Sequence, residues 1–242
     1  MEGGIILKPM LYICNISPKF MNFLWRIILL FSACMLCSMG ISVYPVKFYG
    51  DDHFSKPAND SVTALWAEVD FEASGMINRM AYADTANFMH TKIYPCARCF
   101  LRPEVAMALE LASKAATDKG LKLVVYDCYR PYGFQRKMYE IVNNPRYVAP
   151  PGKGSNHNRG AAIDLTLADE NGVILDMGNP FDDFSQLSEY GNKSISAQAQ
   201  KNRKLLRGIM VKAGFTPYNN EWWHFDYRKK RFATSGYIWD CP

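Results

Sequence analysis

Two short segments that lie far apart in the sequence, residues 155–164 and 221–224, carry two of the chain's four histidines. They offer His157 and Asp164 in the first segment and His224 in the second, with Glu221 close by. Two imidazoles and one carboxylate can hold a catalytic zinc ion, leave one position open for water and use a neighbouring carboxylate as a base. The fold must therefore bring both segments to one point, and metal-dependent hydrolysis is the leading hypothesis.

The same residues also allow a plainer interpretation. Asp164 could cap a backbone turn, the two histidines could be hydrogen-bonded core residues, and Glu221 could be an exposed carboxylate on a strand. Arg130 follows a predicted strand and could be a surface residue at its end. A guanidinium that stays charged could equally stabilise an oxyanion next to a metal.

The pattern of apolar residues predicts an α+β fold. Pro103 opens a helix that Gly120 ends, and further helices are expected over residues 133–142 and 197–213. Strands are predicted at residues 66–70, 121–127, 160–167 and 221–227. Because these elements show no regular β-α-β alternation, we expect a single compact domain with an antiparallel central sheet and flanking helices. The loop over residues 144–158 should border the site, since it runs directly into His157.

The N-terminus has the composition of a targeting segment. Lys19 and Arg26 precede an apolar run over residues 27–37, and residues 38–40 are suited to cleavage. We therefore divide the chain into a signal segment (residues 1–40), a lead-in (41–64) and a catalytic domain (65–242), and predict export to the periplasm or cell envelope. An uncleaved membrane anchor, a lipoprotein and a start at Met21 are alternatives.

Four cysteines remain if the leader is removed: Cys96, Cys99, Cys128 and Cys241. An even number in an exported protein suggests disulfides, with three possible pairings. The close pair Cys96 and Cys99 could instead belong to a structural zinc site or a redox motif.

The net charge of +5 is mild, and the basic runs are not interleaved with aromatic residues. We therefore expect a solvated surface and no nucleic-acid partner. Membrane contact is expected only through the N-terminal segment.

Residues 155–167 and 221–225 closely resemble the zinc D-alanyl-D-alanine dipeptidases of the VanX type, which share their fold with the hedgehog-type and D,D-peptidase zinc proteins. Residues 129–131, 177–182 and 87–88 fit the same pattern, and the resemblance covers about residues 65–230. It implies one zinc ion per chain and hydrolysis of the dipeptide D-Ala-D-Ala in cell-wall peptide turnover.

The resemblance also implies a role for each site residue. His157, Asp164 and His224 would be the zinc ligands, and Glu221 would be the base. Arg130 would stabilise the transition state. Ser155 and Asp182 would contact the two ends of the dipeptide. Asp182 would pair with the free ammonium group of the substrate.

Two other functions are also compatible with the sequence. A D,D-carboxypeptidase on the same fold would need a longer groove in place of the Asp182 contact. A non-catalytic zinc module that binds wall peptides would need neither Glu221 nor Arg130. An exported enzyme would salvage D-alanine, whereas a cytoplasmic one could alter wall precursors and confer glycopeptide resistance.

Overall fold

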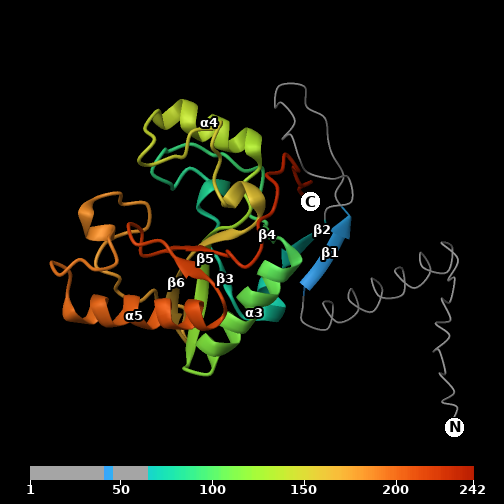
Figure 1. Cartoon of the computed structure of the whole chain (residues 1–242). Helices are drawn as coiled ribbons and strands as arrows, with labels where there is room; N and C mark the ends of the chain where they lie inside the picture. The colour runs from blue at the N-terminus through green and yellow to red at the C-terminus, as the bar shows by residue number, and fades with distance from the viewer. Residues whose placement is uncertain (1–40, 46–64) are drawn as a thin grey trace, which may run out of the picture. The chain divides into compact units, whose positions relative to one another are not determined.

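The computed structural model describes residues 41–45 and 65–242 (Figure 1). By its internal contacts the chain divides into Met1–Met35 and Leu36–Pro242, and all described residues belong to the second unit. The predicted signal segment lies outside the described residues. Within the part of the chain that is described, no helix has both the length and the apolar composition needed to cross a membrane.

The strands form two sheets. The larger sheet has five strands in the order β3 (Ile77–Asn78), β5 (Leu121–Asp127), β6 (Ala162–Asp169), β8 (His224–Asp226) and β7 (Thr216–Pro217). The smaller sheet is antiparallel, in the order β1 (Ile41–Pro45), β2 (Leu65–Val69) and β4 (Phe100–Leu101). In the larger sheet only β3 and β5 run parallel. The predicted α+β class with a mainly antiparallel sheet is confirmed. β1 lies within the predicted lead-in (residues 41–64), where no strand was predicted.

Among the described residues, three long helices flank the sheets: α3 (Pro103–Thr117), α4 (Tyr132–Val142) and α5 (Ala197–Lys212). α3 starts at Pro103, which suits the first helical position, and its buried stripe packs on β5 and α5. α5 contacts β6 and β7, and α4 lies on the other side of the strands from α3 and α5 in Figure 1. The shorter helices are α2 (Phe71–Ser74) and the 3₁₀ turns η1 (Ala81–Ala83), η2 (His157–Arg159) and η3 (Gln186–Ser188).

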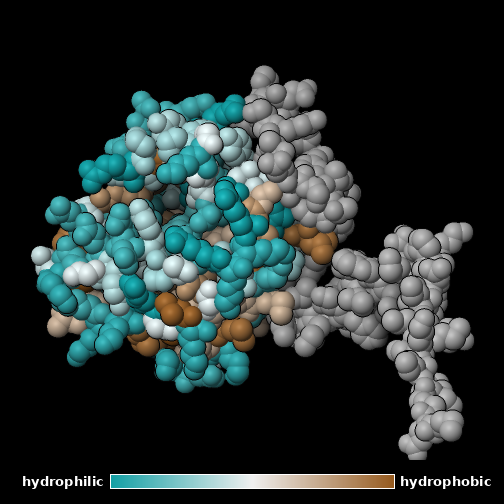
Figure 2. Space-filling model, in the orientation of Figure 1, coloured by the Kyte–Doolittle hydropathy of each residue, from teal (hydrophilic) through white to brown (hydrophobic). Residues whose placement is uncertain are grey.

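Strand β6 is the centre of the core, because its residues from Ala162 to Ala168 are all buried. Such a strand is covered on both faces, and apolar residues on one face can coexist with functional residues on the other. The face of the molecule seen in Figure 2 is mostly hydrophilic, with small separate hydrophobic areas. The large apolar side chains are thus mainly used in packing around β6.

Within the described part of the chain, two disulfides join Cys96 to Cys241 and Cys99 to Cys128. The close pair Cys96 and Cys99 is therefore split between two bridges, which disfavours both a shared zinc site and a redox pair. The second bridge ties the residue before β4 to the residue after β5. It lies in the interior, since both Cys99 and Cys128 are fully buried.

Gly160 connects η2 to β6 and has a backbone conformation that other residues rarely adopt, with φ of 63°. A Cβ atom there would lie 2.3 Å from a ring carbon of Trp66 and 3.2 Å from the backbone nitrogen of Arg102. Its carbonyl also accepts the N–H of Arg102. Only glycine satisfies both the backbone angle and the close approach, so Gly160 determines how His157 enters the site.

Replacing Gly160 with alanine should lower the free energy of unfolding by more than about 1 kcal/mol, because the positive φ and the contact with Trp66 both oppose a side chain. Gly208→Ala is the control, since a Cβ there meets no atom within 4 Å and the site lies inside α5. That change should stabilise by about 0.5–1 kcal/mol. Urea unfolding of both variants measures the difference, and equal stability of the two would contradict this account.

Candidate metal centre

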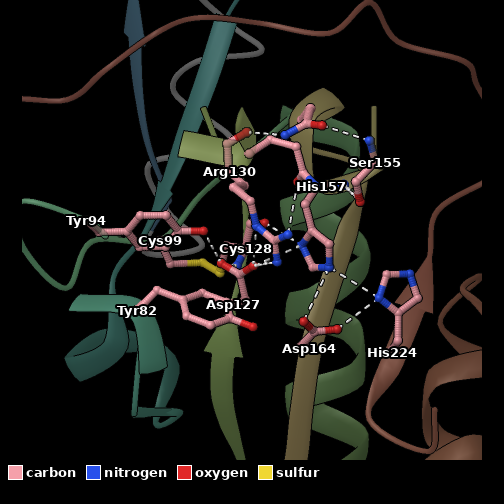
Figure 3. A network of polar contacts seen from close by, with 12 residues as sticks. Tyr82, Tyr94, Cys99, Asp127, Cys128, Arg130, Ser155, His157, Asp164 and His224 are labelled. Atoms are coloured by element: carbon pink, nitrogen blue, oxygen red, sulfur yellow. Dashed lines mark hydrogen bonds and ion pairs between the residues drawn. A yellow bond between two sulfur atoms is a disulfide. The ribbon is translucent and has the colours of Figure 1, made fainter. Parts of the chain in front are cut away.

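Three potential ligands converge at one end of the large sheet (Figure 3). His157 comes from η2, Asp164 from β6 and His224 from β8, and their ligand atoms all lie within 4.8 Å of one another. Asp164 and His224 are directly opposite each other in the antiparallel pair β6–β8. His157 Nε2 is 3.2 Å from His224 Nδ1, and both rings contact Asp164. The structure therefore brings together the three residues that the sequence predicts as ligands.

The outer nitrogen of each imidazole already has a hydrogen-bond acceptor. His157 Nδ1 lies 2.7 Å from the carbonyl oxygen of Cys128, and His224 Nε2 lies 3.0 Å from a carboxylate oxygen of Asp226. With hydrogens on those two nitrogens, the lone pairs of His157 Nε2 and His224 Nδ1 point at Asp164 and at each other. Two lone pairs and a carboxylate facing one point are the donor set of a divalent cation.

The charges at this point fit a cation. Burial works against the charged form of Asp164, but His157 and His224 outweigh it and hold its pKa well below the usual value. Burial also opposes charge on His224, yet hydrogen bonds to Asp164 and Asp226 raise its pKa well above the usual value. The site thus favours positive charge, which a bound cation would supply in place of a proton.

Glu221 lies beside the cluster on a turn rather than on a strand. The strand predicted from residue 221 begins only at His224, and the N–H of His224 closes the turn onto the carbonyl of Glu221. The preceding backbone is held elsewhere, because Trp222 donates its N–H to Ser188 and both Trp222 and Trp223 are buried. Burial raises the pKa of Glu221, which the charge of His224 partly offsets. A carboxylate with a raised pKa is a better proton acceptor.

Arg130 is buried, and its charge is compensated inside the protein. Its Nη2 donates to Asp127 at 2.6 Å (Figure 3). Its Nη1 donates to Gln135 at 3.0 Å. Burial alone would lower the pKa of Arg130, but the charge of Asp127 raises it well above the usual value. The other oxygen of Asp127 accepts from Tyr94 and from the N–H of Cys128. Arg130 is therefore a permanent, fixed cation and not a surface arginine.

Asp127, Gln135 and Asp226 support the site but were not predicted from the sequence. Asp127 and Asp226 carried a signal, since they stand three residues before Arg130 and two residues after His224. On a strand, residues two apart point to the same face, which places Asp226 next to His224. Gln135 gave no such signal, because its contact depends on how α4 packs.

The two residues expected at the ends of a ligand also face this space. The Oγ of Ser155 accepts the N–H of His157 at 3.2 Å. Asp182 has a positive φ of 60° and accepts the hydroxyl of Tyr82 at 3.0 Å. Burial and the charge of Asp164 raise the pKa of Asp182 well above the usual value. A cationic group placed there would favour its ionised form.

One cavity of about 270 Å³ joins all of these groups. Its lining includes every predicted site residue, namely Arg130, Ser155, His157, Asp164, Asp182, Glu221 and His224. The loop over residues 144–158 contributes Tyr147 and Ala149 to the rim, as expected. The volume is close to the lower end of ordinary ligand pockets, about 300–1,000 Å³, which suits a small ligand.

Comparisons with known proteins identify the family. The model of the D-Ala-D-Ala dipeptidase family matches residues 67–237, and the chain belongs to this family. A D-alanyl-D-alanine dipeptidase of Escherichia coli K12 is 44% identical over 147 residues, covering 61% of this chain and 76% of the relative. A second one, from Enterococcus faecium, is 31% identical over 154 residues, covering 54% and 75%. The predicted family is confirmed, and the protein is a peptidase.

Two solved structures share a more distant likeness. The LD-carboxypeptidase LdcB is 25% identical with a TM-score of 0.36, covering 53% of this chain and 59% of that chain. VanYB in complex with D-alanine-D-alanine is 17% identical with a TM-score of 0.36, covering 53% and 72%.

Proposed function

We propose that this protein hydrolyses the dipeptide D-Ala-D-Ala to two D-alanines with the help of a zinc ion. The observation that carries the proposal is the small cavity in which Glu221 and Arg130 flank the His157, Asp164 and His224 cluster. The dipeptidases that match the chain support the substrate. A site that only bound peptides would need neither a buried base nor a buried cation.

His157, Asp164 and His224 would hold the zinc ion, which supplies a Lewis acid and lowers the pKa of bound water toward about 7. Cys128 and Asp226 orient the two imidazoles so that the correct nitrogens face the ion. Zinc rather than calcium or magnesium fits the donor set, because imidazole nitrogen is a typical ligand of zinc and not of those harder ions.

Glu221 would act as the general base and then as the general acid. It would take a proton from the attacking water and deliver it to the nitrogen of the leaving D-alanine. Arg130 would stabilise the negative charge that develops on the carbonyl oxygen of the peptide bond. Because Asp127 and Gln135 already fix the guanidinium, it needs no reorganisation during the reaction.

Glu221→Gln should keep the metal but lower kcat for D-Ala-D-Ala by about 10²–10⁴-fold, because the amide cannot accept the proton. The wild-type kcat/KM should fall on the acid side at a pH above the ordinary glutamate pKa of about 4.3, since burial raises that of Glu221. Removing the metal with a chelator should abolish turnover, and zinc should restore it.

Glu170→Gln is the control, because Glu170 is exposed in the turn after β6. Elemental analysis and steady-state kinetics of both variants provide the measurement. Full activity of the Glu221→Gln variant would contradict the proposed mechanism. Zinc retention by the wild type without hydrolysis of any wall peptide would instead favour a non-catalytic binding module.

The alternative of a D,D-carboxypeptidase depends on Asp182. If the carboxylate of Asp182 binds the substrate's ammonium group, acetylation of D-Ala-D-Ala should lower kcat/KM by about 10-fold or more, the worth of a charged hydrogen bond. Asp182→Asn should lose most of this preference. Comparing both substrates on both proteins decides, and equal cleavage of the acetylated dipeptide by the wild type would favour the carboxypeptidase.

Export to the periplasm or cell envelope, and salvage of D-alanine there, are also part of the proposal. The N-terminal apolar run supports it, and so do the two disulfides, which persist in oxidising compartments. Fractionation of cells combined with N-terminal sequencing should find a shortened protein outside the cytoplasm. A cytoplasmic protein with intact Met1 would overturn this part and leave the resistance role open.

A further inference from the structure

A second hollow of about 210 Å³ adjoins the catalytic cavity. The two spaces meet at residues that line both, namely Pro145, Arg146, Tyr147, Phe184, Tyr218 and Glu221. Tyr147 and Phe184 are stacked, with ring centroids 4.7 Å apart and planes 15° from parallel. We call this stacked pair the partition.

The Phe184 ring of the partition packs against other aromatic side chains. Phe184 has edge contacts with Phe88 and Trp223, at centroid distances of 5.1 Å and 6.1 Å. Trp223 is buried and belongs to the turn that carries Glu221. Aromatic pairs of this kind favour defined offset or edge geometries, so Phe184 has a fixed surface on which Tyr147 can rest.

The loop that carries Tyr147 is anchored to α4 just after that residue. Val148 is buried, Gln135 donates to the carbonyl of Ala149 at 2.6 Å, and Tyr132 donates to the carbonyl of Pro151 at 2.6 Å. The same Gln135 accepts from Arg130. The guanidinium of Arg130 and the loop of Tyr147 are therefore held by the same side chain of α4.

The proposed dipeptide contacts belong to the catalytic cavity alone. Ser155 and Asp182, the residues proposed for the two ends of the substrate, line the first cavity and are not among the residues of the second hollow. A third residue would add about 3.4 Å of chain. Because the two rings line both spaces, a chain that extends from the first cavity into the second hollow passes them.

We propose that the stacked pair Tyr147–Phe184 determines the length of peptide that the site accepts, and that opening it admits a tripeptide into the second hollow. This inference rests on the proposed hydrolysis of D-Ala-D-Ala. The second hollow is lined by polar side chains such as Gln186, Glu189 and Asn220, which can hydrogen-bond a further peptide unit.

The test compares kcat/KM for D-Ala-D-Ala and for tri-D-alanine, which keeps both a free ammonium and a free carboxylate group. Tyr147→Ala is the main variant, because this side chain is 42% exposed and its loss leaves the core intact. The ratio of tripeptide to dipeptide kcat/KM should rise about tenfold or more. Phe184→Ala should change it in the same direction.

Two variants separate length selection from a general loss of structure. Tyr147→Phe keeps the stacked ring and should keep the wild-type ratio. Tyr190→Ala removes a ring that stacks on Arg207 and lines neither cavity, and it should also keep the wild-type ratio.

An unchanged ratio in Tyr147→Ala, with normal zinc content and circular dichroism, would overturn the inference. So would efficient cleavage of tri-D-alanine by the wild type, although the proposed hydrolase function would then stand. If the wild type cleaves neither peptide, the proposed function fails. In that case, calorimetry should measure the affinity of D-Ala-D-Ala and of tri-D-alanine for the zinc-loaded wild type and the Tyr147→Ala variant. The same ratio of tripeptide to dipeptide affinity in both proteins would overturn the inference.

Discussion

The antiparallel pairing of β6 with β8 is the constraint on which the site depends. It places Asp164 directly opposite His224, although the two residues lie sixty positions apart in the chain. The glycine turn at Gly160 then returns the chain so that His157 reaches the same point from η2. A shift of one residue in the β6–β8 register would turn Asp164 to the other face and leave the histidines without their carboxylate. The buried apolar face of β6 opposes such a shift, so core packing and ligand geometry are set by the same strand.

A buried ion pair beside this strand shows why the site stays rigid. Asp127 and Arg130 are both almost fully inaccessible, and a lone charge of either kind there would cost several kcal/mol. Asp127 reaches its place through a register shift between Val125 and Asp127, which sets it opposite Asp164. Bulges of this kind often redirect side chains next to active sites. Every oxygen of Asp127 is used, by Arg130, Tyr94 and the backbone of Cys128, so neither partner can move without leaving a buried charge unpaired.

Much of this arrangement could be predicted from local sequence patterns. The apolar periodicity placed β5 at its observed ends, α3 at its observed start and α5 within one residue, because helices and buried strands leave a short-range signature. The turn at Glu221 was predicted as strand, since two adjacent tryptophans look like strand residues until their packing is known. The disulfide pairing and the contacts of Gln135 depend on elements that meet only in the folded chain. The sequence patterns thus indicate which residues belong to the site, but not which distant elements of the chain meet there.

The residues that act on the peptide bond and the wall that limits the size of the substrate are structurally connected. Gln135 accepts a hydrogen bond from Arg130 and donates one to the loop of Tyr147, so one side chain on α4 supports both the catalytic cation and the wall of the cavity. Trp223 likewise links the wall to a catalytic residue, since its ring contacts Phe184 and its backbone belongs to the turn of Glu221. The position of the wall is thus coupled to the position of the groups that act on the peptide bond. A change that moves the wall without touching Gln135 or Trp223, as at the exposed ring of Tyr147, is therefore the one that separates size selection from catalysis.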